Sequence, residues 1–401
     1  MTHPVRVAAE KIHPWLIETR RKIHMNPEMA FEEHETSRLV AESLAEWGLD
    51  VNPGIAHTGV AGLLDTGRPG PTIGIRADMD ALPVKEENDV PYKSKIDGKM
   101  HACGHDGHTT MLLGAARVLA ENPALLDGVG GRVKFIFQPA EEGRAGGRMM
   151  VEEGVLEDPR VDLVIAAHVY PEMSLGTIGT HTGPTMGSGD KFFITLRGQS
   201  SHAAYPQNSR DPILAAGHVI TALQSVVSRN VNPFDAAVVS VTQMEAGVAI
   251  NIVPEEVLLR GTIRTITAEA RELVKARVRE VAVGVASGFG VEAEVKIQAG
   301  YPSLSNHAGA TALIEKAGGE IIGPENVLPA PLSLGSEDFA YMAQLRPAAM
   351  FRLGIRNEAR GIVNGLHNNR FDLDEDVLPT GVSIFVQAVR EFLADAESYT
   401  G

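Results

Sequence analysis

The residues at positions 101–108 (HACGHDGH) concentrate three histidines and the only cysteine of the chain within eight positions. Neutral imidazole and thiolate are the ligands that borderline divalent ions such as zinc prefer. Gly104 and Gly107 would let the backbone bend closely around a ligand. The alternative is a loop of solvated histidines beside a buried thiol. The octapeptide therefore indicates a metal site, provided that distant segments supply the remaining ligands.

Three other parts of the sequence carry residues of the required types. Glu141 and Glu142 follow the apolar run 135–140, where one carboxylate could bind a metal while the other takes a proton from water. An exposed acidic pair at a helix start is the alternative. His168 ends another apolar run, and His367 lies in the segment GLHNN; alone, each is equally compatible with a structural histidine.

Taken together, the candidates are too many for one catalytic zinc. A catalytic zinc keeps one position open, whereas this set offers five ligands and suits two metals that share a bridging group: Cys103, His105, Glu142, His168 and His367. A nucleophilic Cys103 activated by His105 is a second possibility. It would leave Glu141, Glu142 and the two distant histidines without a role.

The first half of the chain alternates short β-rich runs with helical patterns. We expect helices at 11–25, 34–47 and 109–120, and strands at 59–65, 72–77, 132–138 and 161–167. This alternation predicts an α/β fold with a mostly parallel sheet covered on both faces. Chemical residues follow three of the strands, and open α/β sheets place their sites at that edge: Asp78 and Asp80, Glu141 and Glu142, and His168.

The middle of the chain changes pattern. We expect strand, helix, strand, strand, helix and strand at 191–198, 211–227, 236–244, 255–265, 268–285 and 291–298. This order is the ferredoxin-like βαββαβ arrangement. We therefore expect an inserted domain at 185–298 within a first domain formed by 1–184 and 299–401. Segments at 339–344, 348–353 and 379–394 would complete the first domain.

Composition narrows the classes of partner. The 401 residues exceed one ordinary core, which favours two domains. The net charge of −15 and the lack of a basic run argue against nucleic acid. We find no signal-peptide pattern and no apolar run that could span a bilayer, so no membrane partner is expected. One cysteine permits no intrachain disulfide, which favours the cytoplasm.

The ordered motifs resemble one family from about residue 10 to about residue 392. The chain is similar to the aminoacylase and carboxypeptidase-G family of di-metal metallopeptidases, in its amidohydrolase subfamily, which includes hippurate hydrolase, N-acyl-amino-acid amidohydrolases and plant auxin-conjugate hydrolases. The motifs that carry the resemblance are DMDALP at 78–83, CGHDGH at 103–108, QPAEEG at 138–143, AH at 167–168, SHAAYP at 201–206, NIVP at 251–254, GTIR at 261–264 and GSEDF at 335–339.

The resemblance implies a role for each matching residue. The metal ligands would be Cys103, His105, Glu142, His168 and His367. Glu141 would be the general base, and Asp80 would orient a ligand imidazole or tune the metal. In the inserted domain, which would act as a lid and dimerisation domain, His202 would stabilise the oxyanion, in its own or a partner's site. Asn251 and Arg264 would hold the substrate carboxylate.

The family implies hydrolysis of the linear amide bond of N-acyl-L-amino acids, such as N-acetyl or N-benzoyl conjugates. It also implies two divalent ions per subunit and a homo-oligomer, dimer or tetramer. Many relatives have a ligand segment His-x-Asp where this chain has Asp78-Met79-Asp80, and Cys103 takes the place of that histidine. The sequence leaves zinc, manganese, nickel and cobalt open. The alternatives are a dipeptidase or carboxypeptidase of the same superfamily and a non-catalytic binding protein.

Overall fold

A computed structural model describes residues 3–401. Its internal contacts divide the chain into two compact units. The first unit comprises the residues up to Gly183 together with Ser305–Pro331 and Tyr341–Gly401. The second unit comprises Pro184–Leu304 and Leu332–Ala340. Residues 332–340 thus group with the second unit, whereas the boundaries expected from the sequence assign them to the first domain.

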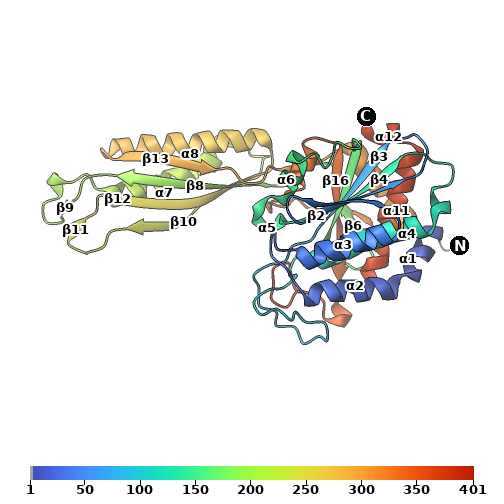
Figure 1. Cartoon of the computed structure of the whole chain (residues 1–401). Helices are drawn as coiled ribbons and strands as arrows, with labels where there is room; N and C mark the ends of the chain where they lie inside the picture. Colours follow the sequence, from blue (N-terminus) through green and yellow to red (C-terminus); the bar gives the residue numbers. More distant parts are fainter. Residues whose placement is uncertain (1–2) are drawn as a thin grey trace. The chain divides into compact units, whose positions relative to one another are not determined.

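The first unit is built on an eight-stranded sheet in the order β1-β2-β4-β3-β5-β16-β6-β15 (Figure 1). Neighbours are parallel from β4 through β3 and β5 to β16, and again between β6 and β15. The pairs β1–β2, β2–β4 and β6–β16 are antiparallel. The predicted α/β class with a mostly parallel sheet is therefore confirmed. The strands are β1 Asp50–Ile55, β2 Gly59–Asp65, β3 Thr72–Asp78, β4 Arg132–Gln138, β5 Leu163–Ser174, β6 Ile178–Thr180, β15 Val327–Pro329 and β16 Ala348–Arg356.

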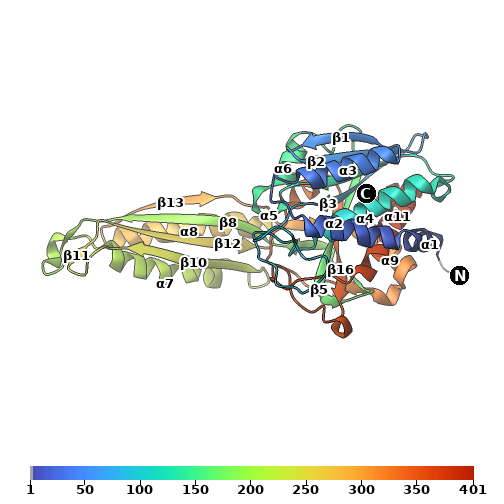
Figure 2. The same cartoon turned by 60° about the horizontal axis from the view of Figure 1, so that its bottom comes forward.

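Helices cover this sheet. The helices assigned to the first unit or its edges are α1 Pro4–Lys11, α2 His13–Met25, α3 His34–Glu46, α4 His105–Glu121, α5 Glu141–Arg144, α6 Gly146–Glu152, α9 Ala308–Ile322, α10 Ala340–Ala343, α11 Leu378–Ala394 and α12 Glu397–Thr400. Alternate residues of the parallel strands, such as Ile75, Phe135 and Phe351, share one buried apolar cluster with α4, α9 and α11. Figure 2 shows α3 lying along β1 and β2 at the sheet edge.

Two local differences from the expected elements have simple causes. The expected helix at 11–25 is divided at Ile12, because α2 starts afresh with Pro14, which has no N–H to continue a helix from α1. The expected helix at 109–120 begins four residues earlier, at His105. The histidine motif therefore forms the first turn of α4 rather than a turn before it.

One helical stretch, Glu375–Ala394, is long and apolar enough to cross a membrane by length and composition. Its most apolar window is 83% buried within the protein. The apolar side chains of α11, including Val382, Phe385 and Val389, belong to the cluster beneath the sheet. The stretch is therefore explained as the central core helix of the first unit.

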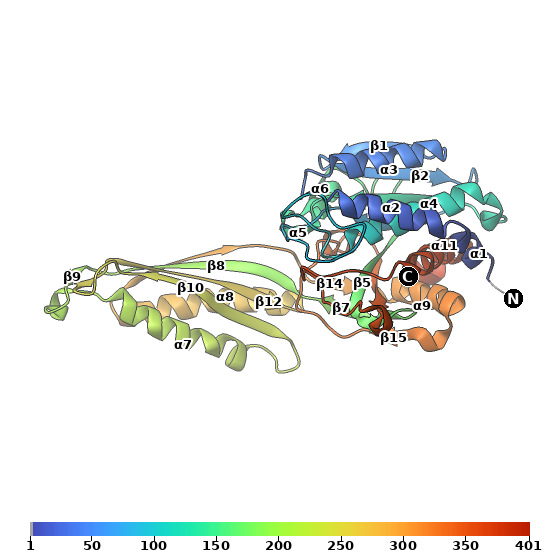
Figure 3. The ribbon, with the colours of Figure 1, turned by 90° about the horizontal axis from the view of Figure 1, so that it is seen from below.

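The second unit is an antiparallel sheet in the order β10-β12-β8-β13 with two helices (Figure 3). Its elements are β8 Ser188–Arg197, α7 Pro212–Asn230, β10 Ala237–Ala246, β12 Glu256–Thr265, α8 Ala268–Gly288 and β13 Glu292–Gln298, with short strands β9 Ser201–His202 and β11 Ile252–Val253. Asp211 caps α7 through the N–H groups of Ile213 and Leu214. Side chains from one sheet face, such as Phe192 and Leu259, form a separate core with α7 and α8.

We predict that Gly261→Ala strongly destabilises the second unit. A Cβ at position 261 would lie 2.1 Å from the Ser240 carbonyl oxygen and 2.2 Å from the Phe192 ring, and backbone in a sheet cannot move away cheaply. We expect a loss of about 1–3 kcal/mol in the free energy of unfolding, measured by urea denaturation. The matched control is Gly217→Ala in α7, which meets nothing within 4 Å and should gain up to about 1 kcal/mol. Equal stabilities would contradict this packing.

Candidate metal centre and catalytic site

The candidate ligands gather at the carboxyl ends of the parallel strands of the first unit. Cys103 and His105 flank Gly104, the residue before α4, which has a φ of 86°. A Cβ there would lie 2.4 Å from Val169 Cγ2, so only glycine permits this approach of the motif to β5. His168 lies within β5 rather than after it, because β5 continues to Ser174 beside β16. The prediction that His168 follows its strand was therefore wrong.

The five predicted metal ligands of the first unit form two groups that share one thiol. The ligand atoms of Cys103, His105 and His168 lie within 4.8 Å of one another. The same holds for Cys103, Glu142 and His367. Thiolate can bridge two cations, so the shared Cys103 suits a pair of metal positions. Glu141 belongs to a third such group with His105 and Glu142.

Two of the histidines are held in the tautomer that a metal requires. His105 Nδ1 lies 2.8 Å from the Asp80 carbonyl oxygen, and His168 Nδ1 lies 2.8 Å from the Val169 carbonyl oxygen. A carbonyl only accepts, so each Nδ1 carries a proton and Nε2 is left as the atom that could bind a metal. Although burial opposes it, the charges of Asp78 and Cys103 raise the pKa of His105, so its Nε2 attracts a proton until a cation takes that place. His105 Nε2 is buried and has no hydrogen bond among the described residues. Burial lowers the pKa of His168 to about 3, which keeps that imidazole neutral.

The electrostatics of the cluster favour a cation. Burial raises the pKa of the Cys103 thiol, so a thiolate there needs positive charge beside it. Hydrogen bonds to Cys103 and Glu142 raise the pKa of His367 to about 10, which means that these two groups already attract a proton to this position. A divalent cation would meet the same attraction more strongly. The residues present therefore fit a metal centre.

The two glutamates are fixed by their backbone. Asp80 Oδ1 accepts the Glu141 N–H at 3.0 Å, and Asp80 Oδ2 accepts the Glu142 N–H at 2.9 Å. The preceding Ala140 has a φ of 56°, and its N–H donates to Glu33 Oε1 at 2.9 Å. Asp80 thus orients His105 through its backbone carbonyl, while its carboxylate anchors the two glutamates. This second contact was not predicted from the motifs.

Asp78 and His108 form a support that sequence reasoning did not identify. His108 Nδ1 donates to Asp78 Oδ1 at 2.6 Å, and His108 Nε2 accepts the Val169 N–H at 2.9 Å. Both nitrogens are used, so His108 is not a ligand but ties α4 to β5. Arg76 Nη1 donates to Asp78 Oδ2 at 2.7 Å. The position of His108 one turn after His105 was the available signal.

A buried ion network lies behind the first turn of α4. Arg20 on α2 donates to Asp106 at 2.7 Å and to Asp372 at 2.8 Å. His24 Nδ1 lies 2.7 Å from the same Asp106 oxygen. Burial alone would raise the pKa of Asp106, but Arg20 and His24 hold it well below its usual range. Nothing in the sequence pattern marked Arg20, because its partners lie 86 and 352 positions away.

The predicted residues of the second unit fall into two separate places. His202 on β9 pairs with Ile252 on β11, and the Asn251 carbonyl accepts the Ala203 N–H. His202 Nδ1 accepts the Ala204 N–H at 3.1 Å, which leaves Nε2 as the proton-bearing atom. Arg264 lies near the far end of β12, and its Nη1 is 3.4 Å from Ser336 Oγ. The eight steps from Glu256 to Arg264 span about 26 Å of strand, so one chain does not bring Arg264 to Asn251.

Glycine makes room for the Arg264 side chain. Gly189 on β8 is the register partner of Arg264, and a Cβ at position 189 would lie 2.0 Å from Arg264 Nη1. The guanidinium therefore occupies space that any other residue at 189 would fill.

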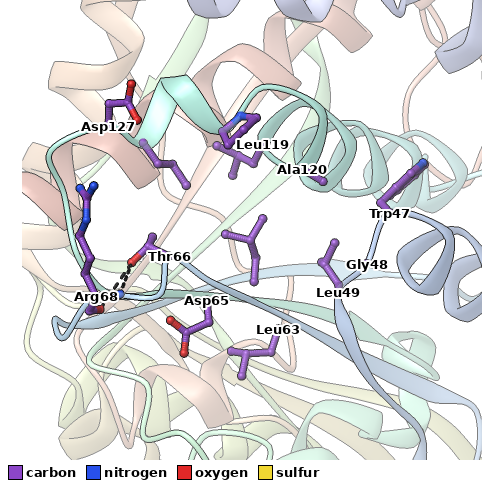
Figure 4. Close-up of a pocket in the computed structure, with 13 residues that line it drawn as sticks. Trp47, Gly48, Leu49, Leu63, Asp65, Thr66, Arg68, Leu119, Ala120 and Asp127 are labelled. Carbon is purple, nitrogen blue, oxygen red and sulfur yellow. Dashed lines mark hydrogen bonds between the residues drawn. The ribbon is translucent and has the colours of Figure 1, made fainter.

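A hollow of about 340 Å³ in the first unit lies elsewhere (Figure 4). Its lining includes Trp47, Leu63, Arg68, Leu119 and Asp127, and it contains none of the candidate ligands. Leu119 is near the carboxyl end of α4, and the histidine motif is at the amino end of this 17-residue helix. At 1.5 Å per residue the two ends are about 20 Å apart, so the hollow is remote from the metal centre.

Comparison with known proteins agrees with this fold and cluster. Residues 74–391 match the family described as Peptidase family M20/M25/M40. The chain is 39% identical to an N-acetylcysteine deacetylase of Bacillus subtilis over 95% of this chain and 97% of the relative. It is 38% identical to IAA-amino acid hydrolase ILR1-like 4 of Arabidopsis thaliana, covering 96% and 87%, and 38% identical to thermostable carboxypeptidase 2 of Saccharolobus solfataricus, covering 93% and 94%.

Among solved structures, the chain resembles the Bacillus subtilis YXEP protein, described as a dinuclear metal binding peptidase from the M20 family. The TM-score is 0.85 at 36% identity, covering 96% of this chain and 99% of that one. The fold and the buried Cys, His and Glu cluster define a metallohydrolase. The chain belongs to Peptidase family M20/M25/M40, so the predicted family and the predicted enzyme class, a hydrolase of amide bonds, are confirmed.

We predict that Arg20→Met destabilises the first unit by about 3–5 kcal/mol, because it removes the guanidinium that faces the buried Asp106 carboxylate together with His24. The pKa of Asp106 is lowered in the folded state, so the stabilisation is present above its unfolded pKa and is lost as pH falls. The deficit relative to wild type should therefore shrink below about pH 4.

The matched control is Arg21→Met. Arg21 contacts Glu375 with a side chain that is 38% exposed, so its removal should cost under about 1 kcal/mol. Urea denaturation between pH 3 and pH 8 measures both variants. Equal losses in the free energy of unfolding for the two variants would show that the buried network contributes no more to stability than the exposed ion pair.

Proposed function

We propose that this enzyme hydrolyses the amide bond of N-acyl-L-amino acids and releases a carboxylic acid and a free amino acid. The observation that carries the proposal is the buried Glu141 carboxylate beside ligand atoms of His105 and Glu142, within 4.8 Å. Relatives named as a deacetylase of N-acetylcysteine and as an amino acid conjugate hydrolase support this substrate class.

The metal-binding proposal assigns Cys103, His105, Glu142, His168 and His367 as ligands of two divalent cations. When bound, the cations would polarise the acyl carbonyl and make water acidic enough to lose a proton near neutral pH. Cys103 belongs to both ligand groups, so its thiolate would help to hold either cation. Zinc, manganese, nickel and cobalt remain the candidate metals, because thiolate and imidazole accept all four.

Glu141 is the proposed general base and acid. Its carboxylate takes a proton from the attacking water as the oxygen adds to the acyl carbon. It then gives the proton to the amine nitrogen as the C–N bond breaks, so the reaction consumes one water and balances. Asp80 holds the Glu141 backbone, which keeps the carboxylate in position for both transfers.

The segment 185–298 is the proposed lid and dimerisation domain. His202 would donate its Nε2 proton to the oxyanion, a role for which the Ala204 contact fixes the right tautomer. Arg264 would bind the substrate carboxylate through its planar guanidinium. Because about 26 Å of strand separates Asn251 from Arg264, both can serve one substrate only if they come from different subunits.

We propose that the subunits form a homodimer through the end of the second unit that carries β9 and β11. Val248 and Ile250 are almost fully exposed there, and further exposed apolar side chains surround them: Tyr205, Ile213, Leu214, Met244 and Ile252. β10 is also an edge strand of its sheet. Such an apolar patch beside an unpaired edge is typical of an interface between subunits.

Two alternatives are separated by substrate. A dipeptidase or carboxypeptidase function is favoured by the carboxypeptidase relative and would require turnover of peptides with a free amino group. A binding protein would hold metal but turn over no amide. The cytoplasmic location stays a proposal that rests on the single, free, buried Cys103.

We predict that metal-stripped enzyme regains hydrolysis of N-acetyl, N-benzoyl or long-chain N-acyl amino acids when zinc, manganese, cobalt or nickel is added. Glu141→Gln should lower kcat by at least about 100-fold, since it removes the proton acceptor but no proposed ligand. Activity is measured as released amino acid, and bound metal by elemental analysis. Unchanged metal content with full activity in Glu141→Gln would overturn the base assignment, and turnover of dipeptides alone would favour the peptidase alternative.

We predict that the double variant Val248→Asp, Ile250→Asp is monomeric, because two buried charges at the proposed interface cost far more than an exposed apolar pair gains. Sedimentation velocity measures the change, and activity should fall with the dimer. The matched control is Phe234→Asp, which changes an equally exposed apolar residue at the opposite end of β10. A double variant that stays dimeric would exclude this surface.

A further inference from the structure

Arg352 on β16 is a buried guanidinium for which the described residues provide no partner. Its residue is 6% exposed, and both Nη1 and Nη2 are buried without a hydrogen bond within residues 3–401. The nearest organised group is the Tyr170 ring, whose centroid lies 4.4 Å from Arg352 Cζ. A cation over an aromatic face gains some stabilisation but satisfies none of its N–H donors.

Two other basic residues are buried on the strands of this sheet, and both are well paired. Lys134 on β4 donates to the carbonyls of Val155 and Asp158 at 3.0 and 2.7 Å. Arg76 on β3 donates to Gln138 and Asp78 at 2.9 and 2.7 Å. The fold therefore satisfies buried cations where they serve structure. Arg352 differs from both, so a structural role does not account for it.

The position of Arg352 relates it to the proposed metal centre. Its register partner on β5 is His168, so both side chains leave the sheet on the same face, on strands about 4.8 Å apart. Tyr170 lies two residues further along β5 and shares that face. His168 and Tyr170 are only partly buried, so both side chains keep some exposed surface on this face. Gly179 on β6 is the register partner on the other side and adds no side chain.

We infer that Arg352 and Tyr170 form a subsite for a second carboxylate of the substrate, in addition to the α-carboxylate. This inference rests on the proposed function and deepens it by naming acidic N-acyl amino acids as the preferred class. A carboxylate would accept hydrogen bonds from the free Nη1 and Nη2 atoms in the fork geometry of the guanidinium. Glu172, the other charged group that acts on Arg352, is exposed and forms no ion pair with it within 4 Å among the described residues.

The second carboxylate can come from either part of the substrate. A dicarboxylic acyl group, such as succinyl, carries it on the acid side of the scissile bond. A glutamate or aspartate carries it on the amine side. Both present the same planar anion to Arg352. A substrate in which the second carboxylate is replaced by an amide has nearly the same size but lacks that charge, so comparing the two separates recognition of charge from recognition of shape.

The test measures kcat/KM of the metal-loaded enzyme on two matched pairs. The acyl pair is N-succinyl-L-leucine and N-succinamoyl-L-leucine, and the side-chain pair is N-acetyl-L-glutamate and N-acetyl-L-glutamine. We expect the acidic member of one pair to be preferred at least tenfold. Arg352→Met should abolish that preference while retaining activity on N-acetyl-L-leucine, which has no second carboxylate. Arg352→Lys should keep part of the preference for the acidic substrate. Glu172→Gln is the matched control and should keep the preference.

Three results would overturn the inference. One is equal use of acidic and neutral members in both pairs by the wild-type enzyme. Another is a uniform loss in Arg352→Met on neutral and acidic substrates with unchanged metal content and thermal stability, which would indicate a general positioning role.

If Arg352→Met does not fold, inhibition of wild type by glutarate against its monoamide decides instead, and equal inhibition refutes the subsite. No turnover of any N-acyl amino acid would refute the proposed function, while direct binding of glutarate against its monoamide, measured by calorimetry, would still test the subsite.

Discussion

The site depends on how the protein keeps negative charge in its interior. Asp78, Asp80 and Asp106 are almost completely buried, and a buried carboxylate is costly unless cations or N–H groups face it. Arg76 faces Asp78, Arg20 faces Asp106, and two backbone N–H groups face Asp80. Each pair joins segments that are distant in the sequence. The fold thereby places His105, Glu141 and Glu142 by the same contacts that make the aspartates tolerable.

Besides these pairs, a second set of acidic groups gathers in the candidate metal centre. Cys103, Glu141 and Glu142 converge within reach of His105, and the ion-pair partner printed for Glu142 is a histidine, His367 Nε2 at 3.3 Å. The raised pKa of His367 reports the same excess of negative potential. Divalent cations are the natural complement, which is why the donor set and the electrostatics lead to one conclusion. Glu141, whose carboxylate lies within 4.8 Å of ligand atoms of His105 and Glu142, is the group that we propose for proton transfer.

Most helices and strands were predictable, because the period of the apolar residues and the turn residues that end a strand can be read within a short stretch of sequence. The strand expected at 132–138 coincides with β4, and the expected α7, α8 and β12 agree within three residues at each end. The short strands β6 and β15 carried no such period, and α9, which contains two adjacent glycines, was not identified. The conversion of the histidine motif into the first turn of α4 depends on contacts of Gly104 with β5. Such contacts are not present in any window of sequence.

The candidate site divides along the same line. The candidate metal ligands and the Glu141–Glu142 pair were recognisable as sequence motifs. The residues that hold these side chains in position were not. Arg20 is an ordinary position of an amphipathic helix until Asp106 is brought beside it. Arg352 illustrates the converse case. A basic residue in an apolar strand is an irregularity of the pattern, and only the structure shows that Arg352 Nη1 and Nη2 lack the hydrogen bonds that Arg76 and Lys134 make. Residues that the fold leaves unsatisfied are therefore as informative about function as the residues that it pairs.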